Sequence, residues 1–173
     1  MRKFLIALVL LVPTLVAWSA QAATVTVVAL GASNTSGRGK GAHPGGVPRS
    51  QAFPAQLQAM LKARGLDARV INAGIAGDTT AGMLARMNSA VPNGTRVVIL
   101  QPGGNDARRG SGNVTSDIVA RLQARGIKVI MLDRPSAYAP ASTRDPDGQH
   151  YNAQGHAAIA AGLLPQVIAA IGR

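Results

Sequence analysis

The sequence predicts an α/β protein in which a mostly parallel sheet of four to five strands lies between two layers of helices. Three observations support this three-layer α/β/α sandwich. Short apolar segments alternate along the chain with segments of helical periodicity, which is the order of βα units. The apolar segments are continuous runs, as in parallel strands covered on both faces. Apolar residues make up 47% of the 173 residues, enough to fill such a core.

Four segments have the composition of buried strands, because they are short, rich in Val, Ile and Leu, and bounded by turn residues. The first spans residues 24–30 and stops at Gly31. The others span residues 68–72, 96–101 and 127–132. Since helical segments separate them, we expect all four to run parallel in one sheet.

The helices are predicted from apolar residues at helical spacing and from their end signals. Gly65 and Gly126 follow the first and third helical segments as C-terminal stops. Asp78 or Thr79 is placed to cap the second helix, and Asn113 the third. We expect helices over residues 53–64, 80–89, 114–125 and 153–171.

The first 22 residues have the features of a signal peptide. Arg2 and Lys3 precede an apolar run that Pro13 interrupts, and the Ala-Gln-Ala tripeptide at 20–22 forms a cleavage site. The run is about 15 residues long, short of the about 20 that a membrane-spanning helix needs. The chain has no Cys, so a lipoprotein anchor is excluded. We therefore expect an exported protein, periplasmic or secreted, with residues 23–173 forming a single domain.

Composition excludes several classes of function. Without Cys there is no thiol nucleophile and no thiolate metal site. No cluster of His, Asp and Glu has the spacing of metal ligands, so we expect neither a metal nor a cofactor. The formal charge of +11 is compatible with an anionic envelope surface as a partner. The basic residues are scattered and not interleaved with aromatic residues, so nucleic acid is not expected.

A Gly/Ser/Asn-rich loop is predicted over residues 31–48. Its Gly-Arg-Gly-Lys-Gly stretch at 37–41 is similar to a phosphate-binding loop, but Asn34 stands where that motif needs Gly, and Gly41 where it needs Ser or Thr. We therefore interpret the stretch as a flexible lip.

Residues with reactive or hydrogen-bonding side chains come directly after the predicted strands. Ser33 follows the first strand, a Gly-bracketed turn at 74–78 the second, and Asn105 the third. Asp147 and His150 lie in the loop before the last helix. Because sites in such sheets lie beyond the carboxyl ends of the strands, these residues are expected to share one edge. A serine hydroxyl needs a base, and an acid three residues before a histidine can orient one.

Together, four segments resemble the four conserved blocks of the SGNH (GDSL-like) hydrolase family. Ser33 lies in the first, within Gly-Ala-Ser at 31–33, and Gly77 in the second, Gly-Ile-Ala-Gly-Asp-Thr-Thr at 74–80. Asn105 lies in the third, Gly-Gly-Asn-Asp at 103–106, and His150 ends the fourth, Asp-Gly-Gln-His at 147–150. The second block is most similar to the bacterial thioesterase/arylesterase/lysophospholipase branch. The resemblance implies the flavodoxin-like fold of that family.

The resemblance implies a serine esterase acting on carboxylic esters or thioesters through an acyl-enzyme. Ser33 would be the nucleophile, His150 the general base, and Asp147 the acid that orients it. The oxyanion would be held by the backbone N–H groups of Ser33 and Gly77 and by the side-chain amide of Asn105. We expect a monomer acting on a small-molecule or lipid ester, without a cofactor.

Two features depart from the family pattern. Ala32 stands where the family has Asp before the nucleophile, so hydrogen bonding around Ser33 must differ. The segment 133–147 is too short for the strand and helix that family members place there, so the sheet could have four strands rather than five. Two alternative functions stay open at this point: a carbohydrate or peptidoglycan O-acetyl esterase, and a non-catalytic protein that binds the cell envelope.

Overall fold

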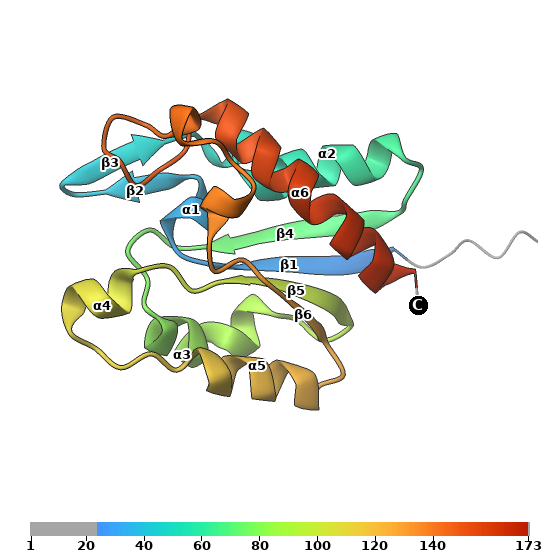
Figure 1. Ribbon diagram of the computed structural model, residues 1–173. Helices are drawn as coiled ribbons and strands as arrows, with labels where there is room; N and C mark the ends of the chain where they lie inside the picture. The colour runs from blue at the N-terminus through green and yellow to red at the C-terminus, as the bar shows by residue number, and fades with distance from the viewer. Residues whose placement is uncertain (1–23, 173) are drawn as a thin grey trace, which may run out of the picture.

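The core of the molecule is one parallel sheet of four strands in the order β4-β1-β5-β6 (Figure 1). The computed structural model describes residues 24–172, so the predicted signal peptide lies outside the described residues. The α/β class and the parallel sheet are confirmed, and the sheet has the lower of the two predicted strand numbers. The strands are β1 (Val25–Gly31), β4 (Ala68–Gly74), β5 (Thr95–Gln101) and β6 (Lys128–Met131).

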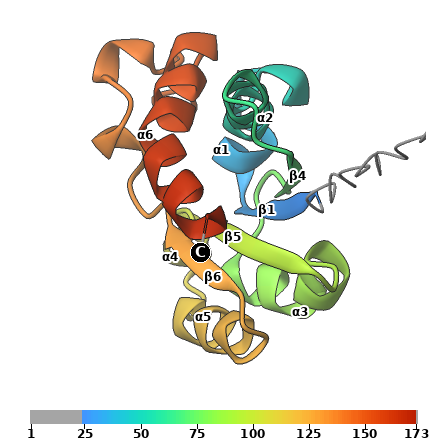
Figure 2. The same cartoon turned by 90° about the vertical axis from the view of Figure 1, so that its right-hand side faces the viewer.

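Helices cover both faces of the sheet, as the three-layer prediction requires. Figure 2 shows α2 and α6 on one face and α3 and α5 on the other. The two faces bury separate apolar clusters, one including Leu57 and Leu163 and the other Met83 and Leu122. The four helices are α2 (Phe53–Ala63), α3 (Thr80–Ala90), α5 (Thr115–Ala124) and α6 (Ala153–Ile171).

The central strand β1 explains why its sequence is a continuous apolar run. Val27 and Ala29 point into the cluster under α2 and α6. Val28 and Leu30 point into the cluster under α3 and α5. All four side chains are fully buried. Since successive residues of a strand face opposite sides, only a strand covered on both faces needs this pattern.

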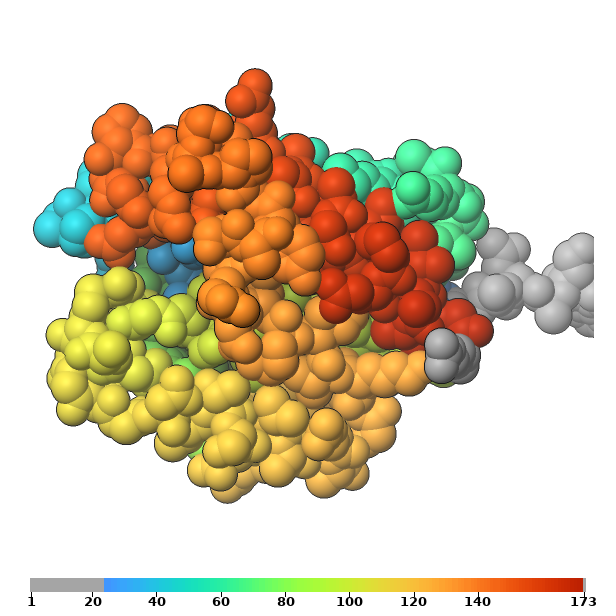
Figure 3. All heavy atoms as spheres, viewed as in Figure 1, coloured from blue at the N-terminus to red at the C-terminus, as the bar shows by residue number. Residues whose placement is uncertain are grey.

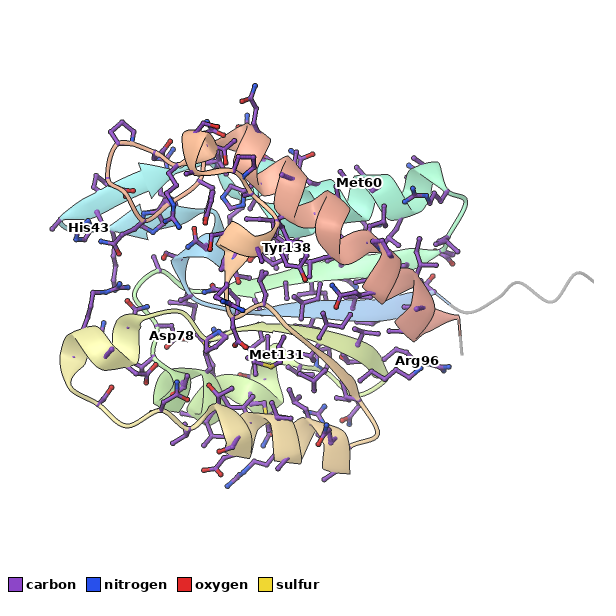
Figure 4. All side chains as sticks on the ribbon, viewed as in Figure 1. His43, Met60, Asp78, Arg96, Met131 and Tyr138 are labelled. Atoms are coloured by element: carbon purple, nitrogen blue, oxygen red, sulfur yellow. The ribbon has the colours of Figure 1, made fainter. Side chains whose placement is uncertain are left out.

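Helix α6 is the core helix of one layer. It is long and apolar enough to cross a membrane by length and composition. In this fold, however, Ile159, Leu163 and Val167 are fully buried against the sheet. Figure 4 shows Tyr138 beside α6, where its ring would collide with a Cβ at Gly162. Because Gly162 has no side chain, the segment that precedes α6 can pack closely against this helix.

Of the capping residues predicted for the starts of α3 and α5, one is confirmed and one is wrong. Thr79 caps α3, its side chain accepting a hydrogen bond from the backbone N–H of Gly82. The N-cap position of α5 is Val114, without a side-chain cap, so the prediction of Asn113 was wrong. Asn113 instead accepts from the N–H of Thr115 at 2.9 Å. Its side chain thus closes a local turn one residue before the helix starts.

The segment after β1 is more ordered in secondary structure than the predicted Gly-rich loop. It contains a one-turn helix and an antiparallel hairpin, followed by a short 3₁₀ turn. Positive φ angles at Gly37 (102°) and Gly46 (107°) bracket the hairpin, a conformation that favours glycine. The same glycines that suggested a flexible lip therefore make the turns. The elements are α1 (Ser33–Ser36), β2 (Arg38–Lys40), β3 (His43–Gly46) and η1 (Arg49–Gln51).

The segment 133–147 holds no strand of the main sheet, as its length suggested. Two 3₁₀ turns, η2 (Pro135–Ala137) and η3 (Ala141–Thr143), carry the chain from β6 to α6. A further short helix, α4 (Asn105–Arg109), follows β5 and was not predicted.

Candidate active site

Asp147 and His150 form a hydrogen-bonded pair before α6. The Nδ1 atom of His150 lies 2.5 Å from Oδ2 of Asp147. The other carboxylate oxygen accepts from the backbone N–H groups of Gln149 and His150, both at 3.0 Å. With Nδ1–H donated to Asp147, the Nε2 atom of the neutral ring is left as a proton acceptor.

The surroundings of Asp147 keep it ionised. Burial tends to raise the pKa of this carboxyl, but hydrogen bonds from the His150 ring and from the backbone of His150 and Gln149 outweigh it. They hold the pKa of Asp147 well below its usual range. The carboxylate therefore stays charged and can orient and stabilise a protonated imidazole.

Ser33 begins the one-turn helix α1 directly after β1. Gln101, at the end of the neighbouring strand β5, accepts hydrogen bonds from the Ala32 N–H and the Thr35 hydroxyl, both at 3.2 Å. The side chain of Ala32 itself is buried in the core cluster. Gln101 thus fixes the turn that carries Ser33. With alanine at position 32, the hydrogen bonds around this turn come from the Gln101 side chain.

Asn105 and the turn before α3 are joined by a direct contact. The Nδ2 atom of Asn105 donates to the carbonyl oxygen of Asp78 at 2.6 Å. Its Oδ1 atom accepts from the Arg108 guanidinium at 2.7 Å. Because one side of the amide faces a cation and the other a carbonyl, its orientation is fixed with the NH₂ group toward the Gly77–Asp78 turn.

Asp106 fixes the loop that follows β5. Its buried carboxylate accepts from the backbone N–H of Thr80 at 3.1 Å and from the Thr80 hydroxyl at 2.9 Å. The loop after β5 is therefore tied to the first turn of α3. This is the loop-fixing role that the Gly-Gly-Asn-Asp stretch suggested.

The structure brings four of the five predicted site residues to one cavity, with Asp147 behind His150. Ser33, Gly77, Asn105 and His150 all line a cavity of about 60 Å³. Asn34, next to Ser33, also donates to the carbonyl oxygen of Gln149 at 3.2 Å. Figure 3 shows the recess between the yellow α4 region and the orange segment before α6, with blue atoms of the α1 region at its floor. Residues more than 100 positions apart thus meet at the carboxyl edge of the sheet.

The hairpin of β2 and β3 packs directly on the Asp147–His150 pair, which the sequence did not reveal. The Gly45 N–H donates to Oδ2 of Asp147 at 3.1 Å. A Cβ at Gly39 would collide with Cε1 and Nε2 of His150. Glycine at both positions allows this close approach, and the Gly-rich composition of the stretch was the signal that could have indicated it.

Asp145 lies two residues before Asp147, but its side chain is directed to the hairpin. Its carboxylate accepts from the backbone N–H of Gly46. Within residues 24–172, no group of three or more His, Asp or Glu side chains could hold a metal ion.

The fold and the site define a class: an α/β/α protein with a serine, a histidine–aspartate pair and amide donors at the carboxyl edge of a parallel sheet. Residues 29–165 match the model of the GDSL-like Lipase/Acylhydrolase family. The chain belongs to this family.

A curated relative and two solved structures are similar to this chain. Esterase TesA of Pseudomonas aeruginosa is 35% identical over 135 residues, which are 73% of this chain and 63% of that protein. The chain thus spans under two thirds of the length of this relative. A crystal structure of TesA has a TM-score of 0.66 at 24% identity, covering 82% of this chain and 97% of the other. AlinE4, an SGNH-hydrolase family esterase, has a TM-score of 0.54 at 27% identity, covering 84% and 71%.

Proposed function

We propose that the protein is a serine esterase that hydrolyses carboxylic esters or thioesters, with Ser33 as nucleophile, His150 as base and Asp147 as the orienting acid. One observation carries the proposal. Ser33 and His150 line the same cavity, while Nδ1 of His150 is bonded to Asp147 at 2.5 Å. These observations support the proposal, because a histidine oriented by a carboxylate can act as the base for a nearby serine hydroxyl.

The reaction has two acyl-transfer steps. His150 Nε2 takes the proton of the Ser33 hydroxyl as its oxygen attacks the ester carbonyl. The tetrahedral intermediate then expels the alcohol or thiol, which receives the proton from His150. A water molecule next attacks the acyl-enzyme with His150 again as base, and the collapse releases the carboxylic acid and restores the Ser33 hydroxyl.

The negative charge on the carbonyl oxygen needs donors in place before the reaction. We assign this role to the backbone N–H groups of Ser33 and Gly77 and to the side-chain amide of Asn105. All three residues line the cavity, and the contacts of Asn105 with Asp78 and Arg108 fix its amide. Such preorganised donors commonly supply a large part of the rate enhancement, about 10²–10³-fold for each.

We also propose that the enzyme works outside the cytoplasm. The support is the basic, apolar and small-residue succession over residues 1–22. The absence of Cys is no obstacle, because this fold is held by two apolar clusters and not by disulfides.

The direct test is hydrolysis of 4-nitrophenyl acetate by the purified protein. We expect Ser33→Ala to lower kcat by at least about 10³-fold, because the attacking oxygen is removed. Ser50→Ala, at an exposed serine of η1, is the matched control and should keep the wild-type rate. Equal rates for wild type and Ser33→Ala would show that Ser33 is not the nucleophile.

A further inference from the structure

Two cavities meet at Ser33, and they lie on different sides of it. The smaller one is also lined by His150 and Gly77. The larger, of about 190 Å³, is lined by neither His150 nor Gly77; it shares with the first Ser33, Asn105, Arg108 and Gln149. In the proposed mechanism the leaving group must lie beside His150, which protonates it. The larger cavity therefore lies on the acyl side of the ester.

The acyl-side cavity is polar. Ala32 is the only residue with an apolar side chain that lines it; the others are glycines or carry amide, hydroxyl or guanidinium groups. Its volume exceeds the roughly 150 Å³ that accommodates a benzene molecule in an apolar cavity. An aliphatic acyl chain would gain little here, because it would desolvate polar groups without pairing them. The lining instead suits a short acyl group with a polar end.

Two arginines reach this cavity from different elements. Arg108 comes from α4, where one guanidinium nitrogen donates to Asn105. Arg144 follows η3 and donates from one nitrogen to the Gly148 carbonyl oxygen at 3.0 Å. Its guanidinium also lies 5.0 Å from the centre of the Tyr151 ring. Each contact holds the side chain while leaving further N–H donors of the planar group for a ligand.

No carboxylate balances these charges at the site. Neither cavity is lined by an acidic residue, and within residues 24–172 neither Arg108 nor Arg144 forms an ion pair. Asp147 faces His150 and Gly45 instead. Lys40 and Arg109 add two further positive charges at Gly77: Nζ of Lys40 would lie 3.3 Å from a Cβ there, and Arg109 donates to the Gly77 carbonyl oxygen at 2.7 Å. The cleft is therefore a positive region that an anion would fill.

We propose that the enzyme prefers esters whose acyl group ends in a carboxylate, that is, half-esters of short dicarboxylic acids. Arg108 and Arg144 bind the distal carboxylate, because the guanidinium fork matches the two oxygens of that group. Hydrolysis consumes one water and releases the alcohol and the dicarboxylate. The inference rests on the proposed esterase function and narrows its substrate class.

The test compares substrates that differ only in the charge of the acyl end. Monoethyl succinate and ethyl succinamate have nearly the same shape, and only the first is anionic. At low ionic strength we expect wild-type kcat/KM to be roughly tenfold or more higher for the succinate, and added salt to reduce this ratio. A ratio near one, with the succinamate hydrolysed, overturns the proposal and leaves the esterase function standing.

Arginine variants then locate the binding group. Arg144→Gln should reduce the succinate-to-succinamate ratio about tenfold, and Arg144→Lys should retain part of it. Because the ratio compares two substrates on one preparation, partial unfolding cancels. Arg121→Gln removes the same charge from an exposed position on α5 and should keep the wild-type ratio. An unchanged ratio in both Arg144→Gln and Arg108→Gln overturns the proposal.

A second substrate pair tests whether the preferred carboxylate belongs to the acyl part or to the alcohol part of the ester. Acetoxyacetate and acetoxyacetamide carry the charge difference on the alcohol part. If the carboxylate preference appears with this pair and not with the succinate pair, the acyl-side assignment is wrong. If the folded wild-type protein hydrolyses none of these esters and no 4-nitrophenyl acetate, the proposed function itself fails.

Discussion

His156 shows at the scale of one residue how burial changes chemistry. Its side chain is fully buried, and its Nδ1 accepts from the backbone N–H of Phe53 at 3.2 Å. Burial lowers the pKa of His156 to about 4, since the charged form would lose its hydration. His150 lies nearby in sequence but has a carboxylate partner. The two histidines therefore have different tasks, one structural and one at the site.

The buried histidine predicts a pH-dependent stability. Between about pH 6.5 and pH 4 the unfolded chain binds a proton at His156 and the folded protein does not, so stability falls as pH falls. From the shift to about 4 we expect a loss of roughly 3 kcal/mol across this window. Urea unfolding at several pH values measures it.

Two asparagine variants separate this effect from other titrations. His156→Asn, whose Oδ1 can accept from Phe53, should flatten the dependence between pH 6.5 and 4. His43→Asn, at an exposed histidine of the hairpin, should leave the slope as in the wild type. Asp147 adds a loss only at the acid end of this window, because its pKa is lowered in the folded protein while the unfolded carboxyl begins to bind protons below about pH 5. An unaltered slope in His156→Asn would contradict the assignment.

At the scale of elements, the β2–β3 hairpin is a support for the site. The backbone of β3 binds both Asp147 and Asp145 through Gly45 and Gly46. The backbone of β2 leaves no room for a side chain between Gly39 and the His150 ring. Helix α6 and the hairpin thus hold the histidine loop from two sides. The hairpin thus contacts the proposed catalytic pair, although it contributes no triad residue.

Gly39→Ala should therefore lower activity with little change in overall folding. The added Cβ would collide with the His43 carbonyl oxygen and with the imidazole, so the hairpin backbone and the ring must both shift. Displacements of about 1 Å can cost roughly 10²-fold in kcat/KM. Ester hydrolysis and far-ultraviolet circular dichroism measure the two effects.

Gly41→Ala is the matched control within the same hairpin. It lies at a φ of 64°, so alanine is strained there, but nothing lies within 4 Å of the added Cβ. We expect some loss of stability and a near wild-type kcat/KM. Full activity in Gly39→Ala would show that the imidazole position tolerates the collision.

At the scale of the whole molecule, the first described strand lies inside the sheet and not at its edge. Residue 24 directly precedes β1, which occupies the centre of the sheet. All helices of both layers pack on strands downstream of that point. The proposed removal of residues 1–22 by cleavage after Ala22 would therefore leave only Ala23 and Thr24 ahead of β1.

Cleavage of this segment is a measurable outcome. When the full chain is expressed in a Gram-negative host, we expect the periplasmic fraction to contain protein that starts at Ala23, as intact mass spectrometry would show. Small residues are needed around the cleavage site, so Ala22→Phe should block processing and serves as the control. An uncleaved wild-type chain in the cytoplasm would contradict the proposed export.

Much of the site could be predicted because its parts follow strands. Ser33, Gly77 and Asn105 each come after an apolar run, and parallel strands place their carboxyl ends at one edge. The positions of the two cavity arginines and of the β2–β3 hairpin could not be predicted in this way. Arg108 and Arg144 belong to segments without periodicity, and α4 was not expected at all. Their position depends on how the loops pack over the sheet edge.

The sequence by itself determined the order of strands and helices, the parallel sheet and the edge that carries Ser33, because these follow from local hydrophobic periodicity and chain direction. Only the tertiary structure decided which glycines admit the hairpin beside Asp147 and His150, and which cations line the acyl-side cavity. Those contacts join distant residues, such as Gly45 and Asp147, 102 positions apart. They arise from packing between elements, which no local pattern of residues encodes.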